Sequence, residues 1–236
     1  MTDPRHRLIV ALDVSSATAA RKIVAAVGDS ADTYKVGMQL YTAEGPAIVR
    51  ELVSSGRRVF LDLKYHDIPN TVGAAVQEAA QLGVSMMTVH ASGGGPMLRA
   101  AAQAAAAQAH APLVLAVTVL TSLDEGELNT VGIRGNIVDQ VLRLAALALT
   151  SGCKGVVASA HEAAALRQEL GQDFAIVTPG VRPAGSGRDD QARVVTPAEA
   201  IAAGATHIVV GRPITEAADP GAEARAILLG LKVLGL

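Results

Sequence analysis

The chain has 236 residues, a formal net charge of −2 and no cluster of Lys and Arg, which argues against a nucleic-acid-binding surface with its usual basic patch. No stretch approaches the roughly 20 uncharged apolar residues that span a bilayer, and the single cysteine, Cys153, excludes an internal disulfide framework and fits a reducing compartment. We therefore expect a soluble cytoplasmic protein with neither a nucleic-acid nor a membrane partner, and a core of Ala, Val, Leu and Ile, because it has only two Phe and no Trp.

Short apolar and β-branched runs alternate with Ala- and Leu-rich helical patterns along the chain. Several helical patterns end at a glycine just before the next run, at Gly56, Gly83, Gly152 and Gly204. Glycine is common there because a helix often closes with a residue in the left-handed conformation. In chain order, the predicted strands cover residues 7–12, 32–37, 58–63, 85–90, 112–118, 154–158, 174–178 and 206–210.

These eight strand–helix units predict an α/β protein that forms one catalytic domain over residues 1–236, a TIM (β/α)8 barrel. A doubly wound open sheet is the alternative. Against the open sheet, the first strand–helix turn, residues 13–16, lacks the glycine-rich fingerprint of a dinucleotide-binding half.

Polar and charged residues recur where the predicted strands end. In a barrel of parallel strands these ends gather at one rim, which is where such barrels place their active sites. The alternative is chance, since every strand must end in some polar residue. The residues with this placement are Asp13, Lys35, Asp62, Lys64, His90, Thr121 and Arg212.

The densest group of charges, residues 62–67, directly follows an apolar run that predicts a buried strand. Side chains two positions apart on a strand point to the same face, so Asp62 and Lys64 should project together. Burying such an opposed pair is costly unless it is well partnered, which favours chemistry over a purely stabilising role. For this pair taken alone, a structural salt bridge at the strand end is the alternative.

Beyond the pair Asp62 and Lys64, the chain carries the ten-residue block 62–71 and several shorter characteristic segments as far as Pro213. Together these segments resemble those of orotidine 5′-phosphate decarboxylases. An isolated Asp-x-Lys-x-x-Asp would indicate only the wider group of phosphosugar barrels. The resemblance depends on the long block Asp-Leu-Lys-Tyr-His-Asp-Ile-Pro-Asn-Thr taken with the other segments. The matching segments are 11–13, 34–37, 62–71, 89–91, 178–183, 190–193 and 210–213.

This resemblance implies an enzyme that removes CO2 from C6 of orotidine 5′-monophosphate and gives uridine 5′-monophosphate in pyrimidine biosynthesis, with no metal, cofactor or covalent intermediate. The carbanion has no neighbouring group to absorb its charge, so the protein must supply a fixed electrostatic environment. By resemblance, the Lys64 ammonium stabilises the carbanion and then donates a proton to it. Asp62, near the substrate carboxylate, and Asp67 hold this ammonium, and Lys35 completes an alternating array of charges.

The resemblance also implies contacts to the ribose and the base. Asp13 and Lys35 should hydrogen-bond ribose hydroxyls, and Thr121 should contact the pyrimidine or its adjoining loop. Asp67 and Thr71 should reach into the site of a partner subunit, which implies a two-fold homodimer with two shared active sites. The residues alone would make Asp67 a helix-capping residue.

A long segment rich in Gly, Pro and charge, residues 179–195, predicts a lid loop after the seventh strand. The loops after the seventh and eighth strands are where TIM barrels commonly bind phosphate. By resemblance, Gln191 and Arg212 contact the substrate phosphate, with the backbone of Gly211 close by, and Arg182 lies along the closing loop. The alternative is a solvated charged loop.

Three other functions compete with this interpretation. A metal-dependent phosphosugar decarboxylase or synthase would use a carboxylate on the second strand to help hold Mg²⁺, whereas this chain has Lys35 there. A Schiff-base aldolase needs a neutral amine, but flanking carboxylates keep Lys64 protonated. The third is a non-catalytic barrel that only binds a nucleotide.

Overall fold

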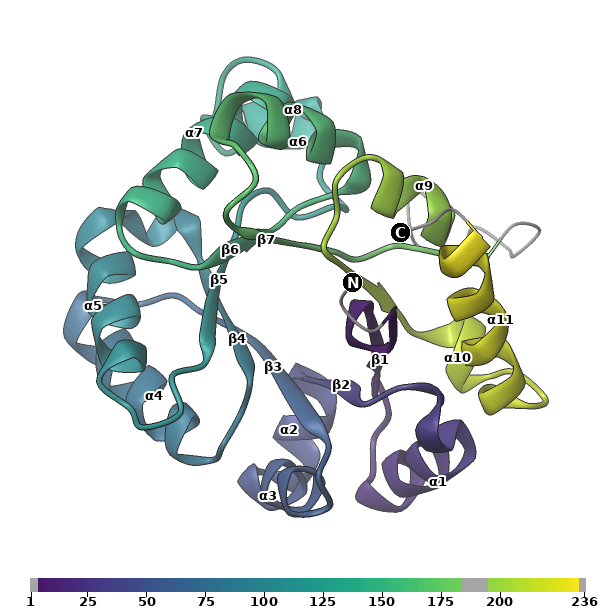
Figure 1. The fold of residues 1–236 in the computed structure, drawn as a ribbon. Coiled ribbons are helices and arrows are strands. Elements are labelled where there is room, and N and C mark those ends of the chain that lie inside the picture. The colour runs from purple at the N-terminus through teal and green to yellow at the C-terminus, as the bar shows by residue number, and fades with distance from the viewer. Residues whose placement is uncertain (1–3, 184–194, 234–236) are drawn as a thin grey trace.

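A computed structural model describes residues 4–183 and 195–233 and contains a closed barrel of parallel strands (Figure 1). The strands follow one another around the barrel in sequence order, and β1 closes the ring against β8 through the pairs Leu8↔Ile208 and Val10↔Val210. The strands are β1 (Leu8–Ala11), β2 (Thr33–Gly37), β3 (Arg58–Tyr65), β4 (Met86–His90), β5 (Leu113–Val117), β6 (Gly155–Val157), β7 (Ala175–Thr178) and β8 (His207–Val210).

This architecture is a TIM barrel, which confirms the predicted fold and rules out an open sheet. All eight predicted strands are present, and no strand end differs from the prediction by more than two residues. The strand positions could be predicted from apolar runs because parallel strands in a barrel are buried on both faces.

Helices form an outer ring around the strands (Figure 1). None of the helices in the described ranges is long and apolar enough to cross a membrane. The α-helices are α1 (Ala17–Val27), α2 (Met38–Glu44), α3 (Pro46–Ser54), α4 (Pro69–Gln81), α5 (Gly94–Ala106), α6 (Glu125–Thr130), α7 (Ile137–Thr150), α8 (Ala160–Leu170), α9 (Pro197–Ala202), α10 (Arg212–Thr215) and α11 (Pro220–Val233). Short 3₁₀ helices are η1 (Pro4–Arg7), η2 (Gly28–Ser30) and η3 (Ala91–Gly93).

The glycines predicted to close helices do have left-handed backbones, with φ values of 80° at Gly56, 82° at Gly83, 99° at Gly152 and 114° at Gly204. Gly204 is also constrained by packing, because a Cβ there would lie 2.6 Å from Cγ of Arg167. Arg167 in turn donates from Nε to the Gly204 carbonyl at 2.9 Å and joins α8 to the segment before β8.

A small apolar cluster fills the interior of the barrel, and larger clusters lie between the strands and the helices. At three places around the barrel, a polar residue follows an interior apolar residue by two positions and so shares its face. The pairs are Ala11 and Asp13, Phe60 and Asp62, and Met86 and Thr88. The catalytic candidates therefore lie directly beyond the interior core, toward the carboxyl ends of the strands. The buried residues of the interior cluster are Ile9, Ala11, Phe60, Met86, Leu115, Val177 and Val209.

Candidate active site

A cavity of about 590 Å³ opens at the carboxyl ends of the barrel strands. This volume lies within the range of small-molecule sites in proteins. Its lining combines apolar residues of the strands, such as Phe60, Val117 and Val209, with polar and charged side chains. The predicted site residues that line the cavity are Asp13, Lys35, Asp62, Lys64, Thr121, Arg182, Gly211 and Arg212.

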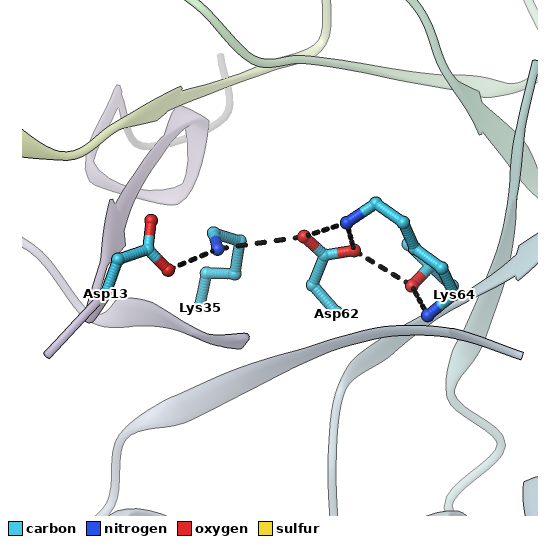
Figure 2. A network of polar contacts seen from close by, with 5 residues as sticks. Asp13, Lys35, Asp62 and Lys64 are labelled. Atoms are coloured by element: carbon cyan, nitrogen blue, oxygen red, sulfur yellow. Dashed lines mark hydrogen bonds and ion pairs between the residues drawn. The ribbon is translucent and has the colours of Figure 1, made fainter. Parts of the chain in front are cut away.

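Four of these residues form a continuous charge network, Asp13–Lys35–Asp62–Lys64, drawn in Figure 2. Lys35 Nζ donates to Asp13 Oδ1 at 2.8 Å and lies 3.7 Å from Asp62 Oδ2. Lys64 Nζ lies 2.9 Å from both carboxylate oxygens of Asp62. Opposite charges thus alternate along the network, so each charge offsets the cost of burying its neighbours.

The network is sheltered at its centre and open at one end. The side chains of Lys35 and Asp62 are 12% and 13% exposed, whereas Asp13 is 54% exposed. Lys64 is 24% exposed. The ammonium of Lys64 is therefore held by a carboxylate on one side and still faces the cavity that it lines.

Gly37 leaves room for the network at the end of β2. A Cβ at this position would lie 2.9 Å from Lys35 Nζ and 3.1 Å from Asp13 Oδ1. The backbone of Gly37, with φ −95°, does not require a glycine. The close approach of the charged pair is therefore the reason that a glycine fits here.

The backbone at Lys64 departs from the regular strand that the sequence predicted. Lys64 has φ 53°, the only positive φ at a non-glycine residue among those described. The pairing of β3 with β4 is regular up to Leu61↔Met87 and resumes at Tyr65↔Val89, which marks a bulge. A non-glycine residue held in this conformation costs about 1–3 kcal/mol, and such strain is frequent at functional sites. Asp62 and Lys64 do come together, but through a bulge rather than simple alternation.

Thr88 on β4 contacts both members of this pair, and the sequence analysis did not identify it. Its Oγ1 accepts a hydrogen bond from the Lys64 backbone N–H and donates one to Asp62 Oδ1, each at 2.9 Å. Thr88 is fully buried. The available signal was one polar residue within an otherwise apolar run, Met86-Met87-Thr88-Val89.

Two arginines also line the cavity: Arg182 follows β7, and Arg212 follows β8, the strand that pairs with β1. Arg182 is 5% exposed, whereas Arg212 is exposed and begins α10. The Arg182 N–H donates to the Val195 carbonyl at 3.0 Å, next to a bridge between Val181 and Val195. Gln191 and the central part of the predicted lid, residues 184–194, lie outside the described residues.

Asp67 and Thr71 are exposed and do not line the cavity of their own chain. The Asp67 carboxylate accepts a hydrogen bond from the Ile68 N–H at 2.6 Å. Ile68 is the N-cap of α4, and its side chain makes no capping bond. Asp67 therefore does not cap this helix, so the alternative derived from the residues alone is wrong.

Two histidines lie beside the charge network. The rings of His66 and His90 are 5.5 Å apart between centroids. Burial lowers the pKa of His90, and the nearby His66 and Lys64 lower it further, while Asp62 opposes this effect. Among the described residues, no group of three or more His, Cys, Asp or Glu is arranged to hold a metal ion.

The fold and the cavity together define a class of protein: a TIM-barrel enzyme whose cavity at the strand ends is lined by a partly sheltered lysine–carboxylate network and by two arginines. The model of one family, described as Orotidine 5′-phosphate decarboxylase / HUMPS family, matches residues 6–227. The chain belongs to this family.

Curated relatives and a solved structure agree with the family. The chain is 51% identical to the orotidine 5′-phosphate decarboxylase of Moorella thermoacetica, over 98% of this chain and 94% of that protein. It is 52% identical to the protein of the same name from Anaeromyxobacter dehalogenans, over 97% and 99% of the two chains. The crystal structure of the Lactobacillus acidophilus orotidine 5′-phosphate decarboxylase matches with a TM-score of 0.86 and 40% identity, over 96% of this chain and 99% of that one.

Proposed function

We propose that the protein decarboxylates orotidine 5′-monophosphate to uridine 5′-monophosphate, a step of pyrimidine biosynthesis, without metal or cofactor. The observation that carries this proposal is the charge network that lines the cavity, in a chain about half identical to proteins named for this activity. The ammonium of Lys64 supplies both a positive charge and a proton at the place where the substrate base would lie.

In the proposed reaction the bond between C6 and the carboxylate breaks, CO2 leaves, and the electron pair stays on C6. The Lys64 ammonium faces this developing charge and stabilises it, because a fixed charge in a sheltered site needs no reorganisation. An Nζ proton then moves to C6, and the neutral amine regains a proton from solvent. Before the reaction, the Lys64 ammonium donates to both carboxylate oxygens of Asp62, each at 2.9 Å, and these two bonds fix its position.

Asp62 has a second proposed effect, on the ground state. A substrate carboxylate placed against Lys64 would also approach the Asp62 carboxylate, which is only 13% exposed. Repulsion between two carboxylates in a sheltered place would be relieved as CO2 departs. Asp13 and Lys35, at the more open end of the network, would hydrogen-bond the ribose hydroxyls, and Thr121 would contact the base.

The phosphate of the substrate would bind near the carboxyl ends of β7 and β8. Arg212 can present two parallel donors to phosphate oxygens, and the backbone near Gly211 is close to the same position. Buried Arg182 would lie behind this site, and Gln191 would join it from the segment outside the described residues. Binding energy from the phosphate could then serve to order the catalytic end.

We further propose a two-fold homodimer in which Asp67 and Thr71 complete the site of the partner subunit. Two features support this arrangement. Asp67 and Thr71 are exposed at the turn and first part of the helix after β3, and two large apolar side chains, Ile68 and Met38, are 65% and 56% exposed. Met38 and Ile68 follow the neighbouring strands β2 and β3, and an interface formed there would remove both side chains from water.

The single catalytic domain over 1–236 and the cytoplasmic location stay predictions. The competing metal-dependent function is less consistent with the site, because the position on β2 carries Lys35, whose ammonium would repel a cation bound beside Asp62. Turnover of orotidine 5′-monophosphate that persists in excess EDTA supports the proposal, whereas a strict Mg²⁺ requirement contradicts it.

The decisive experiment is a spectrophotometric assay with orotidine 5′-monophosphate for the parent and for Lys64→Ala. We expect turnover by the parent and a loss of at least about a thousandfold in kcat for the variant, since it lacks both the charge and the proton donor. Lys64→Ala should still bind uridine 5′-monophosphate, because the phosphate site is intact. A parent protein that binds this nucleotide but never consumes orotidine 5′-monophosphate would show that the proposed function is wrong.

A further inference from the structure

The hydroxyl of Thr88 lies where the backbone ladder between β3 and β4 is interrupted. The paired positions on either side are Leu61↔Met87 and Tyr65↔Val89. Residues 62–64 of β3 therefore face the single residue Thr88 of β4. In a regular ladder a backbone carbonyl would accept the Lys64 N–H, but here the Thr88 side chain accepts it at 2.9 Å.

The direction of both hydrogen bonds follows from the chemistry of the groups. A backbone N–H can only donate, so the Thr88 oxygen accepts from Lys64. The Asp62 carboxylate can only accept when ionised, so the single hydroxyl proton points to its Oδ1, also at 2.9 Å. Thr88 is 0% exposed, so water does not compete for either bond.

This hydroxyl therefore connects the two ends of Lys64. It binds the Lys64 backbone directly, at the residue with φ 53°. It also fixes the Asp62 carboxylate, whose two oxygens each lie 2.9 Å from Lys64 Nζ. The result is a closed loop of contacts through Thr88, Asp62 and Lys64.

We propose that Thr88 is a positioning residue for the decarboxylation, whose hydroxyl holds the left-handed backbone of Lys64 and the orientation of Asp62 so that the Lys64 ammonium faces the substrate. This inference rests on the proposed function. Thr88 does not line the cavity, so it acts through its two partners. Because a misplacement of about 1 Å in a reacting group can cost about a hundredfold in rate, the effect should appear in kcat.

Thr88→Val tests the proposal, since valine keeps the shape and removes the hydroxyl. We expect kcat to fall by about ten- to a hundredfold, while KM and the Kd for uridine 5′-monophosphate change by less than about threefold. Thr88→Ser restores the hydroxyl and should recover most of the lost kcat. If Thr88 contributed only to stability, Thr88→Val would lower the Tm but would not lower kcat while leaving KM almost unchanged.

Thr118→Val is the matched control, because Thr118 is also buried, follows the neighbouring strand β5, and donates its hydroxyl to the Val157 carbonyl at 3.0 Å. It should lose stability but keep the kcat of the parent. If Thr88→Val does not fold, Thr88→Ser and Thr88→Ala supply the same comparison, because they differ from one another only in the hydroxyl.

The inference is overturned if Thr88→Val keeps kcat within about threefold of the parent, if Thr118→Val loses as much, or if the serine variant is no better than the alanine variant. Turnover by the parent is measured first and separates the two proposals. A parent without turnover overturns both, whereas an active parent with an equally active Thr88→Val overturns only the role of Thr88.

Discussion

At the scale of single residues, the site depends on close approaches that leave little room for change. Lys35 Nζ lies between two carboxylates, 2.8 Å from Asp13 Oδ1 and 3.7 Å from Asp62 Oδ2. Gly37 is beside this pair, and its missing side chain leaves the space that the ammonium occupies. A methyl group at that point would displace the Lys35 ammonium but would hardly disturb the backbone.

Gly37→Ala should therefore damage activity more than stability. The new Cβ would lie 2.9 Å from Lys35 Nζ, and this flexible end can move away at small energetic cost. We expect kcat/KM for orotidine 5′-monophosphate to fall by about ten- to a hundredfold, with Tm nearly unchanged. Gly230→Ala is the control, because a Cβ in that part of α11 meets nothing within 4 Å. Parent-like kinetics for Gly37→Ala would contradict the need for this space.

At the scale of elements, neighbouring barrel strands pack so closely that some positions leave no room for a side chain. Gly155 on β6 is the tightest example, since a Cβ there would lie 2.4 Å from the Ala175 carbonyl oxygen and 2.9 Å from Leu115 Cδ2. These neighbours belong to β7 and β5, so β6 is compressed from both sides. The obstruction involves backbone atoms, which cannot rotate away as a side chain does.

Gly155→Ala should consequently destabilise the barrel. Overpacking of a well-packed core costs about 1–3 kcal/mol, and we expect a loss of this size in the free energy of unfolding measured with urea. Gly230→Ala, in an exposed helix position, should instead stabilise by up to about 1 kcal/mol. If the Gly155 variant unfolds at the same urea concentration as the parent, strands β5 to β7 must have more space than the structure gives them.

For the whole molecule, one titrating group at the amino-terminal end of the barrel should govern stability in mild acid. Burial lowers the pKa of His207, at the start of β8, to about 4, and Arg58, Arg7 and His6 lower it further by repulsion. An unfolded histidine has a pKa of about 6.5. Between about pH 6.5 and pH 4, the unfolded chain therefore binds a proton at this histidine that the folded chain does not bind. The free energy of unfolding consequently falls as the pH drops through this interval.

Urea unfolding at pH 7 and pH 5 should reveal this loss, which for His207 alone is about 2 kcal/mol at pH 5. His207→Asn removes the titrating group and should show a smaller difference between the two pH values. An equal difference in parent and variant would assign the acid sensitivity to other groups.

The proposed assembly makes a prediction at the same scale. If Asp67 completes the site of the partner subunit, a mixed dimer of Lys64→Ala and Asp67→Ala chains contains one site with both residues intact. Unfolding and refolding an equal mixture should therefore restore about a quarter of the parent activity, because half of the random dimers are mixed and each has one working site. No recovery from a mixture that does form dimers would show that Asp67 acts within its own chain.

Local patterns in the amino-acid sequence were sufficient to predict the barrel and most of the residues around its mouth. Strand positions could be predicted because each run is apolar on both faces, and the ends of parallel strands must share one rim. Of the seven residues that this reasoning placed at the rim, His90 does not line the cavity. The other six do: Asp13, Lys35, Asp62, Lys64, Thr121 and Arg212. The reasoning depends only on local patterns and on the closure of the sheet.

The contacts that join these residues could not be predicted from local patterns and became visible only in the folded barrel. The hydrogen bonds of Thr88 with Lys64 and Asp62 join residues that are 24 and 26 positions apart in the sequence. They form because the register between β3 and β4 shifts at a bulge, and no local sequence pattern predicted this bulge. The pairing of Asp13 with Lys35 and the space left at Gly37 likewise depend on how β1 and β2 are aligned. Sequence periodicity fixes which face a side chain takes, but distances between strands follow from register, and register is a property of the folded sheet.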